Sequence, residues 1–242
     1  MMKELTIWIT YHDDRQIQEY DLHENDTYRL FKGNNQKVEG ENINHLNSFY
    51  SELVTLYWVW KNEIRSKSVG FCHYRRKFTD VVDVVPGTCQ VMKVMYLGQS
   101  IVQQYKTFHN YQDLYDVMEI LDESYGAGNR YTNYLQTSHM FVPYCCFIMC
   151  YEDFEKLCDF LFPILLAYDR KNDLCQEPSK YRHKQEPSKY RHKAERDFRY
   201  DNVDYQQRAI AFLAERLISA YLVLNMNMVS VQCYSNQKQD EN

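Results

Sequence analysis

Short apolar runs separated by polar, turn-rich stretches mark the first part of the chain. The run Leu5–Thr10 is rich in β-branched residues and ends in the polar tip Tyr11–Asp14, which predicts a first strand. The polar stretch that follows holds a predicted short second strand near Tyr28–Phe31. The apolar run Val69–Cys72 predicts a buried strand, and it leads directly into the polar segment His73–Arg76.

A helix is predicted between these strands, from about Phe49 to Lys61, with Asn47 or Ser48 as its N-cap. Four residues at helical spacing share one apolar face of it: Leu53, Leu56, Tyr57 and Trp60. We expect this face to pack in the core. Glu52 lies away from the face and is therefore the better candidate for a ligand contact.

The rest of the chain predicts a mixture of strands and helices. Strands are expected at Val81–Gly87, Val91–Met95 and within Phe141–Cys150, and helices at Ser100–Tyr105, Tyr111–Tyr125 and Glu152–Tyr168, the last interrupted by Pro163. Gly126 and Gly128 break the second of these helices. They do not form a dinucleotide-binding fingerprint, because no strand precedes them and no helix of the right spacing follows.

A chain of 242 residues with 45% hydrophobic residues is long enough for one substantial core. We therefore expect a single α/β domain over residues 1–242, with a mostly parallel central sheet and helices on both faces. The net charge of −5 excludes a general nucleic-acid binder, which needs a basic footprint. No nucleic-acid partner is expected.

Eight cysteines are present, but several lie inside apolar runs, where a free thiol acts as a small hydrophobic group. The sequence contains no Cys-x-x-Cys pair, so it does not indicate a structural zinc site. No secretory signal opens the chain, and no apolar run reaches the roughly 18 residues of a membrane span. The expectation is a cytoplasmic protein with reduced thiols.

The nonapeptide QEPSKYRHK occurs twice in succession, at Gln176–Lys184 and Gln185–Lys193. Nine residues rotate a helix by about half a turn and reverse the face of a strand, so the copies cannot share one structural role. We interpret residues 176–193 as a duplicated insertion in a surface loop, where added length costs little. A basic arm directed at anionic lipid and an artefact of the sequence record are the alternatives.

Arg75 and Arg76 are the strongest indication of chemistry. In an open α/β sheet the carboxyl ends of the strands face the ligand crevice, and guanidinium groups suit phosphate oxygens. Because neighbouring residues on a strand point opposite ways, we expect one of the two to face the pocket. A structural ion pair is the competing interpretation. His73 could bind a phosphate or a sugar hydroxyl, or be a satisfied core histidine.

Glu215 is the second candidate, because it lies in the apolar helical segment Ile210–Leu224 beside Arg216 and needs a partner or a task there. It could bind a sugar hydroxyl, act as a general base for an acceptor hydroxyl, or form an ion pair, for example with Arg208 or one of the central arginines. Binding or pairing is favoured over base chemistry.

Four blocks of this sequence, in this order, resemble the capsular-polysaccharide-synthesis glycosyltransferase family known as domain of unknown function 4422. Its members resemble "ELTALYWxWKN", "GxCHYRRxF", "MFIM" and "YQxRxxGFLAERL". The counterparts here are Glu52–Asn62, Gly70–Phe78, Cys146–Met149 and Tyr205–Leu217. The resemblance covers about Leu5 to Leu224.

This resemblance implies a GT-A-like, Rossmann-like domain that uses a nucleotide sugar, most readily a UDP-hexose, as donor. Many GT-A enzymes bind a divalent metal through an Asp-x-Asp motif, but this chain has none. We therefore expect arginines to offset the charge of a leaving diphosphate and assign no metal ligands. A metal held by Asp80 and Asp83, or by Asp13 and Asp14, stays an alternative.

The candidate catalytic residues are Glu215, Arg75 and Arg76. The candidate substrate-binding residues are Tyr11, His12, Glu52, His73, Tyr74, Tyr205, Gln206, Arg208 and Arg216. The expected function is transfer of a hexose to a capsule or lipopolysaccharide acceptor, either a glycan or a lipid-linked glycan, at the inner face of the membrane. The main alternative is a binding domain without turnover. A phosphatase or nucleotidyltransferase is less well supported, because no nucleophile elbow or phosphate-binding glycine loop is present.

Overall fold

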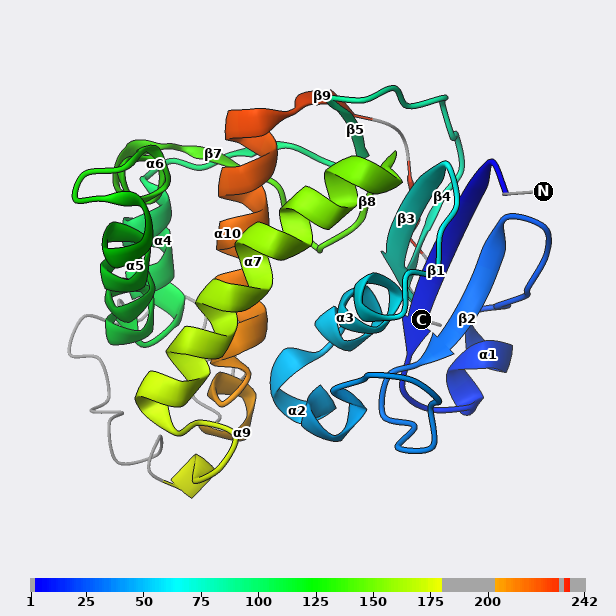
Figure 1. The fold of residues 1–242 in the computed structure, drawn as a ribbon, viewed down its shortest axis with the longest axis horizontal. Coiled ribbons are helices and arrows are strands. Elements are labelled where there is room, and N and C mark those ends of the chain that lie inside the picture. The colour runs from blue at the N-terminus through cyan, green and yellow to red at the C-terminus, as the bar shows by residue number, and fades with distance from the viewer. Residues whose placement is uncertain (1–2, 180–202, 231–232, 236–242) are drawn as a thin grey trace, which may run out of the picture.

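The computed structural model describes residues 3–179, 203–230 and 233–235. Within these ranges, six strands form the central sheet in the order β2-β1-β3-β8-β5-β9 (Figure 1). They are β1 (Leu5–Tyr11), β2 (Tyr28–Lys32), β3 (Ser68–His73), β5 (Thr88–Val91), β8 (Phe147–Cys150) and β9 (Asn227–Ser230). β1 pairs in parallel with β2 and β3, and β5 with β9, whereas β8 is antiparallel to β3 and β5. The predicted mixed α/β fold with a mostly parallel sheet is confirmed.

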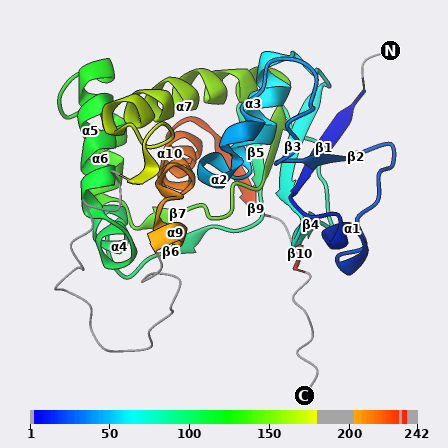
Figure 2. The same ribbon diagram turned by 90° about the horizontal axis from the view of Figure 1, so that it is seen from below.

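Helices flank this sheet. The described helices are α1 (Arg15–Glu19), α2 (Asn47–Tyr50), α3 (Leu53–Lys61), α4 (Ile101–Phe108), α5 (Tyr111–Tyr125), α6 (Arg130–Thr137), α7 (Tyr151–Asn172), α9 (Val203–Gln206) and α10 (Ala209–Asn225). The long helices α7 and α10 pack together in the middle of the molecule, and α4, α5 and α6 lie on their far side from the sheet (Figures 1 and 2). Two small antiparallel pairs, β4 (Arg76–Phe78) with β10 (Cys233–Ser235) and β6 (Met95–Tyr96) with β7 (Met140–Phe141), complete the described fold.

Both faces of the sheet are apolar, which explains the continuous apolar runs in its strands. Trp8, Phe71 and Phe147 belong to the larger hydrophobic cluster, which joins this face to α3, α7 and α10. Ile9 and Cys72 belong to the cluster on the opposite face, next to the α1 region and β4. The side chains that follow β1 and β3 are thus divided between two faces, and this division determines which of them can meet.

Several predicted elements differ from the structure. Val91–Met95 is not one strand, because only its first residue, in β5, and its last residue, in β6, lie in strands. Val81–Gly87 is not a strand, because pairing on this part of the chain begins only at Thr88. A helix does follow the glycine pair: Asn129 caps α6 by accepting hydrogen bonds from the backbone N–H groups of Tyr131 and Thr132. α7 continues through Pro163 without interruption, because both halves of the helix bury apolar side chains in the same core.

The predicted insertion over residues 176–193 lies outside the described residues from residue 180 onward. The free thiols are those of Cys72, Cys89, Cys145, Cys146, Cys150, Cys158 and Cys175. Among the described helices, none combines the length and the apolar character that crossing a bilayer requires.

Candidate functional site at the ends of strands β1 and β3

His12 and His73 lie next to each other where β1 and β3 end. The two strands are parallel, with Thr10 opposite His73, and His12 follows Thr10 on the same face of the sheet. The centroids of the two imidazole rings are 6.3 Å apart. Glu52 reaches them from the N-terminus of α3, where its Oε1 lies 3.1 Å from His73 Nε2. Three sequence blocks that are distant along the chain therefore meet at one point.

The tautomer of His73 follows from its backbone contact. The Arg75 N–H donates a hydrogen bond to His73 Nδ1 at 3.3 Å. In neutral His73 the proton is therefore on Nε2, from which it is donated to Glu52. Burial lowers the pKa of His73 to about 4; Glu52 opposes this shift, and Arg75, His12 and Arg76 add to it.

His12 and Glu52 are also perturbed. Burial lowers the pKa of His12, against the effect of Glu52 and with that of Arg208 and Arg75. Burial raises the pKa of Glu52, but His73, a backbone hydrogen bond and Arg208 outweigh this, so its net pKa is lowered. At neutral pH the cluster therefore consists of two neutral imidazoles and one carboxylate, close to cationic side chains.

An interruption between helices α2 and α3 directs Glu52 toward the strand ends. The expected single helix over Phe49–Lys61 is wrong: α2 begins at Asn47, without a side-chain cap, and ends at Tyr50. Ser51 takes a positive φ of 49°, and α3 begins at Leu53. Arg208, at the N-terminus of α10, donates a hydrogen bond to Ser51 Oγ. The break thus positions both Glu52 and Arg208.

The expected strand alternation of the two arginines is wrong, because Tyr74 and Arg75 form a turn and only Arg76 belongs to β4. The Arg75 guanidinium carbon lies 5.1 Å from the Tyr74 ring centroid, and that of Arg76 lies 3.7 Å from the Tyr144 ring centroid. Among the described residues, neither arginine forms an ion pair with a carboxylate. Arg75 is exposed and Arg76 half-buried, and both contribute to the depressed pKa of His73.

Glu215 approaches the site from α10, but its two oxygens have protein partners. Oε1 accepts the backbone N–H of Tyr144 at 2.9 Å, and Oε2 lies 3.1 Å from Arg216 Nη1. The predicted ion pair is present, with Arg216 and not with Arg208.

Several candidate residues lie outside the His12–Glu52–His73 cluster. Tyr11 packs on the opposite face of the sheet. Buried Gln206 bonds His109 Nδ1 and the Phe108 carbonyl, and the ring of Tyr205 packs on Phe212. Arg216 donates to Gln104 Oε1. Tyr74 does border the cluster: its ring centroid lies 3.9 Å from that of His73.

Gly33 and the turn at Tyr144 were not predicted as parts of this site. A Cβ on Gly33 would lie 2.8 Å from Asn47 Oδ1 and 3.1 Å from His12 Nδ1. Both of these polar atoms are buried without a hydrogen-bond partner in the described structure. The sequence offered only the turn signal Gly33-Asn34-Asn35 for the first and no signal for the second.

One group of described residues could hold a metal ion: His12, Glu52 and His73. Their potential metal-ligand atoms all lie within 4.8 Å of one another. Two imidazoles and a carboxylate suit zinc and related transition metals. The hydrogen bond of His73 with the backbone fits a bound metal less well. If His73 Nε2 bound a metal, Nδ1 would carry the proton, but Nδ1 is the atom that accepts the Arg75 N–H. In this hydrogen-bonding state the group is a histidine–carboxylate pair.

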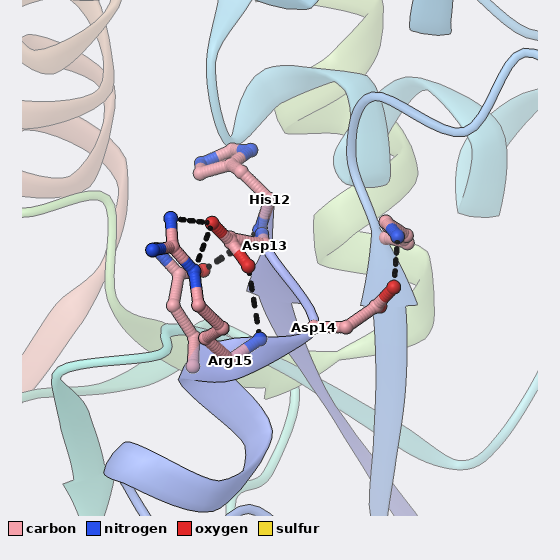
Figure 3. Close-up of polar contacts among 6 residues, drawn as sticks. His12, Asp13, Asp14 and Arg15 are labelled. Atoms are coloured by element: carbon pink, nitrogen blue, oxygen red, sulfur yellow. Dashed lines mark hydrogen bonds and ion pairs between the residues drawn. The ribbon is translucent and has the colours of Figure 1, made fainter.

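The aspartates proposed as alternative metal ligands do not belong to this group. Asp13 binds Arg15 through the backbone N–H and the guanidinium, and Asp14 pairs with Lys32. Figure 3 shows the two carboxylates directed apart, with the His12 ring pointing away from both. Asp80 and Asp83 are exposed.

A separate hollow of about 490 Å³ opens on α5 and α6, lined by Tyr115, Met118, Glu119, Asp122, Glu123, Thr132 and Gln136. It contains none of the candidate residues. Chemistry, and not volume, therefore identifies the site at the strand ends.

Comparison with known proteins agrees with this fold. The apo structure of the WbbM bifunctional glycosyltransferase matches with a TM-score of 0.69 and 20% sequence identity, over 97% of this chain and 46% of that chain. This chain thus spans less than half of that protein, and at this identity the likeness shows the fold alone. No curated protein matches by sequence.

A family profile described as "Domain of unknown function (DUF4422)" matches residues 17–93 and 81–186. These ranges include the first three sequence blocks that suggested this family, while the block Tyr205–Leu217 lies beyond them. Because the match covers more than half of the chain, the protein belongs to the DUF4422 family, as its motifs indicated.

Proposed function

We propose that this protein is a glycosyltransferase that transfers a hexose from a nucleotide-sugar donor to a glycan or lipid-linked glycan of a surface polysaccharide, either capsule or lipopolysaccharide. One observation carries the proposal: a histidine–carboxylate cluster at the carboxyl ends of β1 and β3 lies close to Arg75, Arg76 and Arg208. The family membership and the fold shared with a protein named as a glycosyltransferase support it.

The arginines would serve the leaving group. When the sugar departs from a nucleotide sugar, negative charge develops on the diphosphate. Arg75 and Arg76 lack carboxylate partners in the described structure, and their guanidinium donors suit phosphate oxygens. The proposed chemistry does not need a resident metal. His12, Glu52 and His73 would be the ligands if one binds.

The histidine–carboxylate cluster would serve the sugar. Glu52 is ionised at neutral pH and is held by the Nε2–H of His73. An ionised carboxylate in a fixed position accepts hydrogen bonds from sugar hydroxyls, and neutral His12 can accept one through its unprotonated ring nitrogen. A reaction on a lipid-linked acceptor would run at the cytoplasmic face of a membrane, with the protein in peripheral contact.

This proposal can be tested by thermal melting of the protein in the presence of UDP, GDP, CMP or their hexose derivatives, each with manganese or with EDTA. A ligand at 100 times its dissociation constant stabilises by about 2.7 kcal/mol, which is several degrees at about 2–4 °C per kcal/mol for a domain of this size. We expect a shift with one nucleotide class, most readily UDP, that persists in EDTA and is reduced in Arg75→Ala.

The outcomes separate the alternatives. A shift that requires manganese would replace the arginine mechanism with a metal site. A shift without release of sugar in the presence of any acceptor would indicate a binding domain without turnover. No shift with any nucleotide would contradict the proposed donor site.

A further inference from the structure

The turn at Tyr144 and Cys145 is a strained segment beside the site. It connects β7 to β8, and both residues take positive φ values, 80° and 50°, although neither is glycine. Such conformations are strained for residues other than glycine and persist only where the surroundings fix them. The contacts that fix this turn are therefore informative.

Glu215 provides one of these contacts. Its Oε1 accepts the Tyr144 N–H at 2.9 Å, and the Cys146 thiol donates to the Tyr144 carbonyl at 3.1 Å. The other carboxylate oxygen pairs with Arg216, whose guanidinium also donates to the Phe212 carbonyl at 3.0 Å. Glu215 thus connects α10 to the turn.

The turn is close enough to both Glu215 and Glu52 to feel their charges. The Tyr144 ring packs against the Arg76 guanidinium at 3.7 Å. The pKa of the Cys145 thiol is raised well above its ordinary value by burial, and by the charges of both Glu215 and Glu52. A displacement of this turn would therefore affect both Arg76 and the environment of Glu52.

Exposure does not distinguish the two glutamates, since the side chains of Glu215 and Glu52 are 25% and 23% exposed. Their partners do. Glu215 is bound to a backbone amide and to a buried arginine, 4% exposed, that has further contacts with Gln104, Tyr105 and Phe141. Glu52 binds the imidazole of His73 at the ends of the strands.

We propose that Glu215 is a positioning residue, which holds the Tyr144–Cys145 turn and through it Arg76, and that Glu52 is the carboxylate that meets the substrate. This inference rests on the proposed glycosyltransferase function. It removes Glu215 from the catalytic candidates of the sequence analysis, and it keeps Glu52 as the ligand contact expected there.

Glu215→Gln tests this assignment, because an amide oxygen can still accept the Tyr144 N–H but cannot act as a base. We expect Glu215→Gln to retain kcat/KM within about tenfold of wild type, because the turn keeps its partner. Glu215→Ala should lose roughly a hundredfold, as expected for displaced site residues. Glu52→Gln, the same change at the other carboxylate, should lose a hundredfold or more.

A loss of a hundredfold or more in kcat for Glu215→Gln, with nucleotide binding intact, would overturn the proposal, since that is the effect of removing a general base. If Glu215→Gln does not fold because Arg216 is left as an unpaired buried charge, Glu215→Gln/Arg216→Met removes both charges and keeps the acceptor for Tyr144. The same limits then apply to the double variant. Absence of nucleotide binding in the wild-type protein would refute the proposed function itself, and the two failures are thus distinguishable.

Discussion

At the level of single residues, Gly33 leaves a space beside His12 that any larger side chain would fill. Any side chain at this position would press on Asn47 Oδ1 and on the His12 ring. Gly98 is the matched control, because a Cβ there meets no heavy atom within 4 Å. The two glycines therefore separate a local effect on the site from the general effect of replacing glycine by alanine.

We expect Gly33→Ala to weaken nucleotide-sugar binding by about three- to tenfold, which corresponds to roughly 0.7–1.4 kcal/mol. Asn47 can move away, but His12 must shift with it, and the fold should be retained. Gly98→Ala should leave the affinity unchanged. Isothermal titration calorimetry with the nucleotide sugar measures both variants, and equal affinities for Gly33→Ala and wild type would exclude His12 from the sugar site.

The sequence identified His12, Glu52, His73 and Arg208 as separate candidates, but it could not identify the contacts among them. The Glu52–His73 pair depends on the break at Ser51, and no glycine or proline marks that break. Likewise, the partner of Glu215 depends on a side-chain rotamer of Arg216. Residue type predicted the chemistry, whereas tertiary structure determined which groups meet.

At the level of elements, the strands buried on both faces were easier to predict than the break between α2 and α3, whereas Val81–Gly87 was wrongly predicted as a strand. Continuous apolar runs such as Val69–Cys72 are typical of strands buried on both faces, and the structure confirms them. The helical periodicity of the sequence continues across Ser51, so it did not indicate that α2 ends there. At Pro163 the only sign of an interruption was the proline itself. Packing against the core decided both cases: it keeps α7 continuous and separates α2 from α3.

His109 connects the end of α4 to α9 and α10. Gln206 Nε2 donates to the Phe108 carbonyl, so its Oε1 faces His109 Nδ1 at 3.1 Å, and the His109 ring stacks on Phe212. Burial, with a contribution from Arg216, lowers the pKa of His109 from 6.5 to about 3. Between these pH values the unfolded chain binds a proton that the folded protein does not, so stability decreases as the pH falls from 6.5 toward 3.

We expect His109→Asn to reduce this pH dependence, by up to about 1.4 kcal/mol per pH unit. Asparagine keeps an N–H donor for Gln206 but cannot be protonated. Urea unfolding at several pH values between 7 and 4.5 measures the effect. The variant should be less stable than wild type at pH 7 because the stacking on Phe212 is lost, and its stability should fall less on acidification. Identical slopes for the two proteins would contradict a buried neutral His109.

At the level of the whole molecule, the candidate site joins segments from opposite ends of the sequence. His12 follows the first strand, Glu52 and His73 come from the next blocks, and Arg208 begins the last long helix. The α/β class followed from the alternation of strands and helices, and the family from the sequence motifs. The order of strands around β8, which is antiparallel to both neighbours, had no signal in the sequence.

This arrangement predicts that a bound nucleotide protects distant segments together. We expect slower amide hydrogen exchange at the ends of β1 and β3, and equally at the α2–α3 junction and the first turn of α10, because Arg208 bonds Ser51 there. Exchange in α5 should not change. Protection at the strand ends alone would show that Arg208 does not take part in binding.

The pairing of β9 with β5 also has a consequence for synthesis on the ribosome. β5 gains its parallel neighbour only after α10 and residues Asn227–Ser230 have been made, and Arg208 emerges almost as late. A nascent chain can therefore form β1, β2 and β3 long before Arg208 can join the candidate site. Fragments released early during translation would present part of the sheet without the complete candidate site, and would be substrates for chaperones and proteases.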